Sequence, residues 1–353
     1  KLSQQEIESL LAESPLTLPK EVFDAAPSTA APYTTGKVKA SALQAAADRL
    51  NALRRIAGLP AVTLDLSLCE NAQYGAVIQA ANGSLDHYPD QPAGMGDSFY
   101  QQAKSASASS NLAAGHTLTG AVDAFMDDSD ASNIATLGHR RWQLNPTLGK
   151  VGFGYAVSGR GYSRYVAEKV FDRSGAGCDY DFIGWPASGS FPAQLFDGDT
   201  AWSVTLNPAK YQAAVKSALT VTLTRESDGK TWTFSSRGSD GFFNVTSSGY
   251  GEGYCVIFRP EGVDDYMGTY TVRIEGLKAL NGQDVEDFTY QVDFFGSETA
   301  GQDSTAAEQP EQAGTQGGSS QTAGAAFRDV PAAHWASAAI KAAVEQLSLI
   351  HIS

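Results

Sequence analysis

The sequence predicts an α+β protein with a helix-rich first half and a β-rich second half. Apolar residues recur at helical spacing between residues 39 and 81. From residue 195 onward, short runs rich in Thr, Val, Phe and Tyr alternate with Gly, Asp and Asn, which is typical of strands and turns. A stretch rich in Gly, Gln, Ser, Thr and Ala at 297–326 then precedes a short final segment. We therefore expect several domains joined in series.

Size and charge limit the classes of partner. The chain has 353 residues, which is long for one hydrophobic core and predicts two or three domains. Its 39 acidic and 25 basic residues give a formal charge of −14, so nucleic acid and anionic membranes are not expected as main partners. The sequence has no apolar run long enough for a transmembrane segment. It opens on polar residues at Lys1, as expected for an exported protein whose leader has been removed, or equally for a cytosolic one.

The three cysteines, Cys69, Cys178 and Cys255, are widely spaced and form no Cys-x-x-Cys pair. This spacing predicts neither a zinc ribbon nor a disulfide framework, and leaves at most one bridge. Cys69 falls in a predicted helix and is expected to be a small buried residue.

Residues 1–38 are predicted to form an N-terminal arm that lies on the next domain. Gln4–Leu11 is a short amphipathic helix candidate, and the Ala-, Pro-, Ser- and Thr-rich sequence after it cannot build a core alone.

The next domain is predicted at residues 39–194. Ser41–Gln44 and Ser67–Glu70 read as capping boxes that open two helices, the second of which reaches about Ala81. A further short helix is expected at Ala121–Met126. These helices would flank a hairpin in which Val151–Val157 and Tyr162–Val170 are joined by a Gly-rich turn, which together give a layered α/β domain.

Residues 195–296 are predicted to form an immunoglobulin-like β-sandwich. Short β-type runs with almost no helical periodicity favour this architecture. The predicted strands are Ser203–Leu206, Leu219–Thr224, Thr231–Ser235, Tyr254–Phe258, Tyr270–Ile274 and Phe288–Phe294. The Gly- and Pro-containing segment around Gly184-Trp185-Pro186 is expected to bridge the two domains. Residues 297–326 contain four acids and no Lys or Arg, and are predicted to be a disordered linker.

The densest chemistry lies in Gly138-His139-Arg140-Arg141, followed by Leu144-Asn145-Pro146 and Val151-Gly152-Phe153-Gly154. In order with Ser84-Leu85-Asp86-His87 and Ser110-Asn111-Leu112, these motifs resemble bacterial CAP (SCP-like) domains, the family of cysteine-rich secretory proteins, antigen 5 and PR-1. The resemblance covers about Lys39–Phe171 and implies a CAP-type α-β-α sandwich.

The resemblance implies that His87 and His139 face one another across a cleft that can hold a divalent metal, of which zinc suits two neutral imidazoles. Two family glutamates are replaced here, by Ser110 in the Gly-Glu-Asn motif and by Asp128 in the Trp-x-x-Glu motif. Since a serine is a poor metal ligand, metal-free, partnered histidines are the other possibility, and no cofactor is required. The ligand-binding candidates are His87, Asn111, His139 and Arg140.

Two arginines follow His139 in the motif. Arg140 and Arg141 can clamp a carboxylate or phosphate; alternatively, one pairs with an acid such as Asp127 or Asp130 and the other is solvated.

A serine hydrolase would use Ser110 as nucleophile, His87 or His139 as base and Asp128 as the orienting acid. These residue types are suitable for catalysis, but no Gly-x-Ser-x-Gly motif surrounds Ser110.

Residues 327–353 form the last predicted unit. Phe327-Arg328-Asp329-Val330-Pro331 and His334-Trp335-Ala336 resemble the start of an S-layer homology repeat, which implies a short helical fragment and binding to cell-wall polysaccharide or peptidoglycan. Only part of one repeat is present, whereas such repeats usually act in threes.

Three functions remain open at this stage. The first is an exported, cell-surface module of a Gram-positive-type bacterium that binds a cell-wall fragment or small apolar ligand, or acts as an effector, without classical catalysis. The second is a metal-assisted or His/Asp-dependent hydrolase of peptide or cell-wall substrates. In the third, the CAP domain is a scaffold and the β-sandwich carries adhesion.

Overall fold

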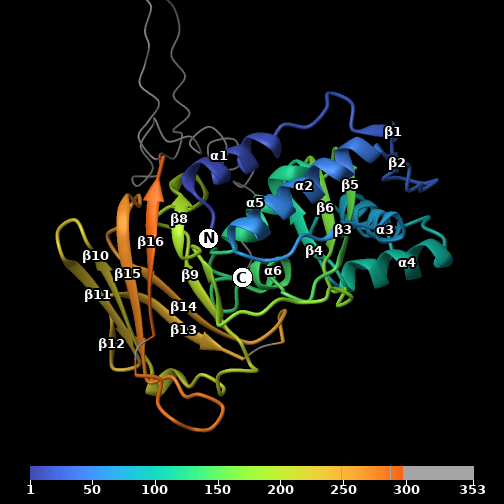
Figure 1. The fold of residues 1–353 in the computed structure, drawn as a ribbon. Coiled ribbons are helices and arrows are strands. Elements are labelled where there is room, and N and C mark those ends of the chain that lie inside the picture. The colour runs from blue at the N-terminus through green and yellow to red at the C-terminus, as the bar shows by residue number, and fades with distance from the viewer. Residues whose placement is uncertain (248, 287, 297–353) are drawn as a thin grey trace, which may run out of the picture. The chain divides into compact units, whose positions relative to one another are not determined.

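A computed structural model of the chain describes residues 1–247, 249–286 and 288–296. Helices and a small sheet make up the first part of this region, and two larger sheets make up the second (Figure 1). No helix in the described ranges is long and apolar enough to cross a bilayer. The predicted linker at 297–326 and the predicted repeat fragment at 327–353 lie outside the described residues.

The N-terminal arm is held down by one helix and a two-stranded sheet. Helix α1 (Gln4–Glu13) has a capping box in which Ser3 and Glu6 bond each other's backbone N–H, and its Ile7 and Leu11 are buried. Strand β1 (Phe23–Ala25) then pairs antiparallel with β2 (Lys37–Val38). The arm therefore packs on the molecule through a helix that the sequence predicts.

Five helices belong to the first large part: α2 (Ala40–Ile56), α3 (Leu66–Asn82), α4 (Asp97–Ala108), α5 (Leu118–Asp127) and α6 (Gly138–Gln143). The helices α2, α3 and α5 are where the sequence predicts them, but both predicted capping boxes are wrong. Lys39 precedes α2 without a side-chain cap, and Asp65 caps α3 by accepting from the N–H groups of Ser67 and Leu68. The serines of both predicted boxes lie inside the helices, because each helix begins earlier than its serine.

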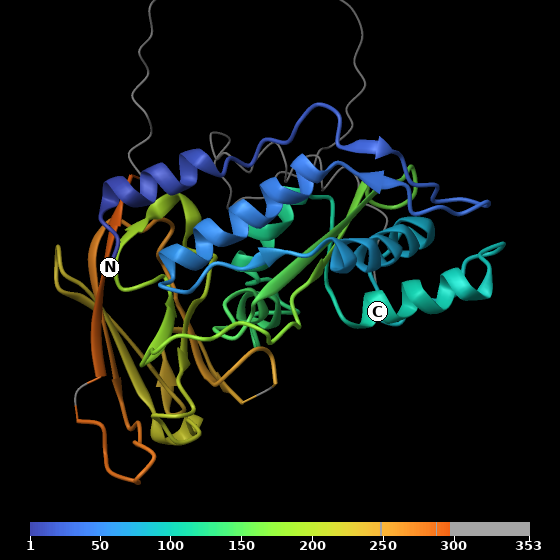
Figure 2. The same cartoon turned by 45° about the vertical axis from the view of Figure 1, so that its right-hand side comes forward.

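A four-stranded sheet lies between these helices, in the order β3 (Thr63–Leu64), β5 (Lys150–Val157), β6 (Arg164–Lys169) and β4 (Asn111–Ala114). The glycines of the Val-Gly-Phe-Gly motif allow α3 to approach β5, because a Cβ on Gly154 would lie 2.3 Å from the carbonyl oxygen of Ala72. Phe153 and Tyr155 alternate with these glycines and join the main hydrophobic core. Figure 2 shows α3 and α4 side by side on one flank of the sheet.

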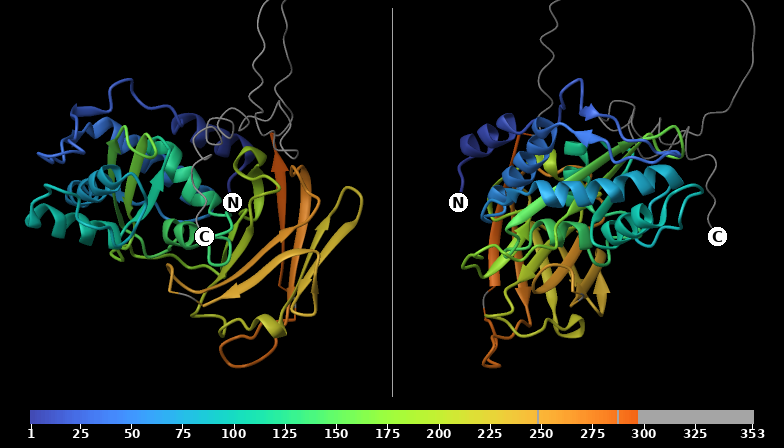
Figure 3. Two further views of the ribbon diagram at one scale, coloured as in Figure 1. Left: turned by 180° about the vertical axis from the view of Figure 1, so that it is seen from behind. Right: turned by 90° about the vertical axis from the view of Figure 1, so that its right-hand side faces the viewer.

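The second large part contains a six-stranded and a four-stranded sheet (Figure 3). The first has the order β12 (Gly238–Ser239), β11 (Lys230–Ser235), β10 (Thr220–Arg225), β15 (Gly268–Glu275), β16 (Phe288–Phe295) and β8 (Gly189–Pro192). The second has the order β13 (Gly241–Thr246), β14 (Tyr254–Pro260), β9 (Trp202–Leu206) and β7 (Phe182–Trp185). All pairs are antiparallel except β8 with β16. The region is β-rich as predicted, and its immunoglobulin-like assignment stays a prediction.

The predicted boundary between residues 194 and 195 is wrong. Strand β7 pairs with β9 and strand β8 pairs with β16, so both sheets already contain residues that precede 195. Glycine and proline around Trp185 made this segment resemble a linker, but Trp185 is 1% exposed and belongs to the main core. Local composition could not reveal these pairings, because their partners follow much later in the chain.

The three cysteines are all free in the described part of the chain, and Cys69 is buried in α3 as the sequence predicts. Cys255 is also buried, in β14, whereas Cys178 is partly exposed. None of them therefore contributes a disulfide staple to this fold.

Candidate functional site

His139 is fixed in place by Asp128. Asp128 ends α5 in the left-handed region at φ 47°, and its side chain is 1% exposed. One carboxylate oxygen accepts from Nδ1 of His139 at 2.7 Å, and the other accepts from the backbone N–H groups of His139 at 2.9 Å and Arg140 at 3.3 Å. One carboxylate thus caps the first turn of α6 and sets the orientation of the imidazole.

The second ring nitrogen of His139 is left available. No hydrogen-bond partner of Nε2 occurs among the described residues, and the side chain is 22% exposed. Burial acts to lower the pKa of His139, but the hydrogen bond to Asp128 and the nearby negative charges outweigh burial, so the pKa is raised. The site therefore presents a fixed imidazole that binds a proton more readily than usual.

A buried glutamate that the sequence analysis missed, Glu168, lies on strand β6. Glu168 of β6 is directly opposite Asn111 of β4, and it is fully buried. Its carboxylate accepts from the amide of Asn111 at 2.9 Å and from the amide of Gln143 at 2.9 and 3.1 Å. Burial raises the pKa of Glu168 to about 7, although the two amides and the charge of His139 act to lower it.

Asn111 connects Glu168 to α6, because its amide also approaches the carbonyl oxygen of His139 at 3.4 Å. The predicted ligand-binding residue Asn111 is buried and serves this internal network. A glutamate directly after the apolar residues Tyr165-Val166-Ala167 of a predicted strand was the one signal in the sequence for Glu168. Nothing in its spacing indicated a partner, since Asn111 lies 57 positions earlier.

His87, the other histidine of the predicted site, has a different hydrogen-bond partner from His139. Its ring is exposed, and Nδ1 donates to the carbonyl oxygen of Ser107 at 2.9 Å. His87 and His139 thus contact different residues, and no hydrogen bond joins them. The predicted cleft between the two imidazoles stays a prediction.

The described residues do not supply the donors that the predicted zinc site would need. In the described ranges no three His, Cys, Asp or Glu side chains come together, whereas catalytic zinc sites use three protein ligands. Nδ1 of His139 is also already engaged by Asp128. These residues do not fit such a site, so no chemical step is assigned to a metal here.

Ser110 is not placed as a nucleophile. It is 1% exposed, and its hydroxyl donates to the carbonyl oxygen of Ala106 at 2.7 Å. No hydrogen bond connects it to His87 or His139, so the triad that the residue types suggested is not assembled.

Arg140 and Arg141 do not form a ligand clamp. Arg140 is completely buried and donates to the carbonyl oxygens of Met126, Asp127 and Ala201 at 2.5 to 2.6 Å. It also donates to the hydroxyl of Ser203 at 3.1 Å, so it joins α6 to β9 of the second part. Arg141 is 3% exposed and donates to two further carbonyl oxygens. The prediction of Arg140 as a ligand-binding residue is therefore wrong, and so is the alternative that one arginine is solvated.

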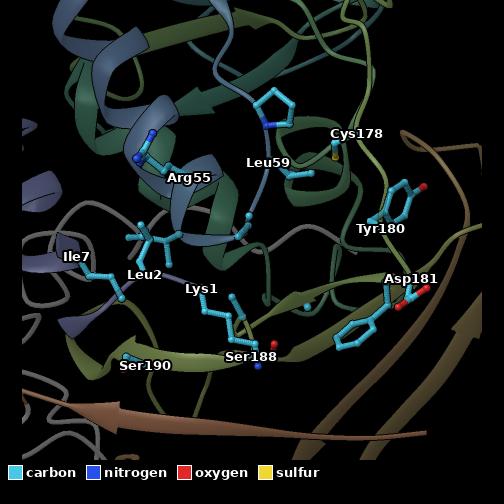
Figure 4. A pocket seen from close by; sticks show the side chains of 17 residues that line it. Lys1, Leu2, Ile7, Arg55, Leu59, Cys178, Tyr180, Asp181, Ser188 and Ser190 are labelled. Carbon is cyan, nitrogen blue, oxygen red and sulfur yellow. The ribbon is translucent and has the colours of Figure 1, made fainter.

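A cavity of about 580 Å³ lies apart from His139, where α1 and the end of α2 face β7 and β8. Figure 4 shows Leu2 and Ile7 on one side of it and Tyr180 and Asp181 on the other. Neither His87 nor His139 lines this cavity. Its walls are partly apolar, and its volume is in the range of small-molecule pockets.

Part of the chain is similar to a known family. Residues 47–170 match the family model of CAP, the cysteine-rich secretory protein family. The matched segment includes Asn111, Asp128, His139 and Glu168. A search among curated proteins finds no match to the chain.

Proposed function

We propose that this chain is an exported, cell-surface binding protein whose CAP domain holds its ligand at the surface around His139. The observation that supports this most directly is the imidazole fixed by Asp128, with Nε2 unpaired in the described part of the chain. A fixed, partly exposed ring nitrogen can donate to or accept from a polar group of a ligand at little entropic cost. The CAP match supports a ligand-binding or effector-type module.

The surroundings of His139 favour a ligand with both polar groups and ring faces. Trp142 lies one helical turn after His139 and packs on Phe171, with ring centroids 4.2 Å apart. Phe171 is 39% exposed, so part of this aromatic pair reaches the surface. Cell-wall fragments combine hydroxyl, amide and sugar-ring groups, and we propose them as the ligand class. The alternative partner, a small apolar ligand, would suit the cavity beside Leu2 and Ile7 better.

Binding of soluble muropeptides tests this proposal. Isothermal titration of the full chain should give measurable binding that the change His139→Gln weakens at least about tenfold, because each tenfold loss corresponds to about 1.4 kcal/mol and one charged hydrogen bond is worth that much. His116→Gln is the matched control, since His116 is an exposed loop histidine. Equal affinity in His139→Gln and the unchanged chain would exclude the imidazole as a ligand contact.

The wall-anchoring part of the proposal depends on residues 327–353, which resemble an S-layer homology repeat and lie outside the described residues. Cosedimentation of the full chain with purified cell wall should drop when Trp335 is changed to Ala. Unchanged cosedimentation would leave wall association to another part of the chain, such as the β-rich region.

A hydrolase is the second candidate, because the contact of Asp128 with Nδ1 is also the arrangement that prepares a histidine for general-base catalysis. With Ser110 buried, the nucleophile would be water activated at Nε2 of His139. Incubation of labelled peptidoglycan or casein with the chain decides this point. Turnover that His139→Gln abolishes would support a hydrolase, whereas binding without turnover supports the first candidate.

A further inference from the structure

Lys169 lies next to Glu168 in β6 but on the other face of the sheet. Because successive residues of a strand point to opposite faces, Lys169 shares its face with Tyr165 and Ala167, which pack against Ala72 of α3. Its side chain is half-buried there. Its Nζ donates to the hydroxyl oxygen of Ser109 at 2.5 Å.

Lys169 has no carboxylate partner within the described residues. The elements packed around it carry Glu70 on α3 and Asp97 and Lys104 on α4, and none of the three forms an ion pair with it. Asp65, at the start of α3, pairs with Lys150 at 3.1 Å. An ammonium group that is half-buried without a counter-charge releases its proton more easily, and burial lowers the pKa of Lys169 to about 8.

The plain structural role for Lys169 would be to cap the carbonyl end of α4, but those carbonyl oxygens already have partners. The hydroxyl of Ser109 donates to Ser105 at 2.7 Å, and the backbone N–H of Ser109 donates to Ala106 at 3.2 Å. The carbonyl oxygen of Ser107 accepts from His87. Lys169 therefore contacts the side chain of Ser109 and none of these carbonyls.

We propose that Ser109 and Lys169 form a serine–lysine dyad that accepts an acyl group from an activated ester. Ser109 is the C-cap of α4, and both Ser109 and Lys169 are half-buried. A hydroxyl within hydrogen-bond distance of an amine that is partly neutral near pH 8 is the arrangement used for lysine-assisted nucleophiles.

The chemical step balances with the two side chains and the ester alone. Neutral Lys169 removes the proton from the Ser109 hydroxyl while Oγ bonds to the carbonyl carbon, and the tetrahedral intermediate expels the alcohol. The ammonium of Lys169 returns the proton to the departing alkoxide. The product is an acyl ester on Ser109, which water can hydrolyse with Lys169 again as the base. In the structure the Ser109 hydroxyl donates to the carbonyl oxygen of Ser105, so the hydroxyl must rotate toward Nζ of Lys169 before the proton is transferred.

This dyad is independent of the proposed binding site, because Lys169 and Glu168 lie on opposite faces of β6 and neither Ser109 nor Lys169 contacts His139. Loss of muropeptide binding in His139→Gln would not affect the dyad. Failure of the dyad would likewise leave the His139 proposal intact.

The experiment uses p-nitrophenyl acetate with the full chain, following nitrophenol release and mapping the acetylated peptide by mass spectrometry. We expect acetylation at Ser109, with a rate that increases with pH and levels off above about 8 as Lys169 loses its proton. Ser109→Ala and Lys169→Arg should each lower that rate at least tenfold. Arginine keeps a positive charge beside α4 but cannot act as a base at these pH values.

Lys104→Met is the matched control and should leave the rate unchanged. Lys104 is an exposed lysine on α4, the helix that ends at Ser109. Folding of each variant is checked by circular dichroism, and Lys169→Met serves where Lys169→Arg does not fold. Acetyl groups spread over surface lysines, or a rate at Ser109 that Lys169→Arg does not change, would overturn the proposal and leave Lys169 as a structural contact.

Discussion

The interior around α6 and β6 differs from the interior between the two large sheets. Around α6, the fully buried groups include the charged side chains Arg140 and Glu168, each satisfied by backbone or amide partners. Between the sheets, Trp202 is surrounded by aromatic rings, with Phe258 and Phe294 both at 5.7 Å and Tyr266 at 5.5 Å. Both regions contain fully buried side chains, but one includes hydrogen-bonded charged groups and the other is made of packed aromatic rings.

This difference between the two interiors indicates where the functional site lies. Apolar rings stabilise a fold through the area they bury, and many arrangements of them would do so. Buried charges are costly and give little net stability, but they fix geometry because each needs specific partners. The buried charged groups lie around His139. Their specific partners therefore fix the structure most firmly where the partly exposed imidazole lies. The aromatic interior supports the second part as a packed body.

The largest expected effect separates the two interiors by stability. Arg140→Met should lower the free energy of unfolding by about 4 kcal/mol, because the carbonyl oxygens of Met126, Asp127 and Ala201 lose their donor while remaining buried. Urea unfolding followed by tryptophan fluorescence measures the loss.

Trp202→Phe is the matched change in the aromatic interior. It should cost about 2 kcal/mol, since most of the ring packing is retained, while part of the ring volume and the hydrogen bond from the indole to Tyr266 at 3.0 Å are lost. An Arg140→Met cost no larger than that of Trp202→Phe would contradict the proposed difference between the interiors.

The next effect is a pH dependence of stability caused by Glu168. Its pKa is about 7 in the folded chain and near the ordinary value of 4.5 when unfolded, so between these values the folded chain holds the extra proton. The free energy of unfolding therefore falls as pH rises through this window, by on the order of 3 kcal/mol from this group. Glu168→Gln removes the ionisation and should be more stable than the unchanged chain at pH 8.

Urea unfolding of both chains at pH 4.5 and pH 8 tests this prediction. The advantage of Glu168→Gln should be small at pH 4.5, where the folded glutamate is protonated and the unfolded one is only half ionised, and should grow toward pH 8. The same change at the exposed Glu70 should give parallel pH profiles. An advantage of Glu168→Gln that does not change with pH would show that folding does not raise the pKa of Glu168.

The smallest effect concerns the imidazole itself. Asp128→Asn keeps an acceptor for the backbone N–H groups of α6 but removes the negative charge beside His139. The pKa of His139 should fall, because the hydrogen bond and charge of Asp128 act to raise it against burial. Proton NMR titration of the histidine ring measures the change, with exposed His116 as internal reference. An unchanged pKa of His139 would mean that Asp128 orients the ring but does not favour its protonated form.

The sequence predicted most of the local structure. The helices α2 and α3, the β5–β6 hairpin and six strands of the second part follow from periodicity and turn residues, which act over a few neighbouring positions. The helix α4 and the strands β7, β8 and β13 were missed. The segments of β7 and β8 are rich in glycine, and distant partners stabilise both strands.

What the sequence by itself determined about this protein is the CAP segment, the identity of His139 and its following arginines, and the acidic, multi-part character of the chain. Only the tertiary structure decided that Asp128 fixes His139, that Arg140 is internal, and that Glu168 and Lys169 lie on opposite faces of one strand. The physical reason is that motifs record neighbours along the chain. Burial, hydrogen-bond partners and charge balance depend on residues that lie far apart in the chain, such as Arg141 and Gly253, which are 112 positions apart.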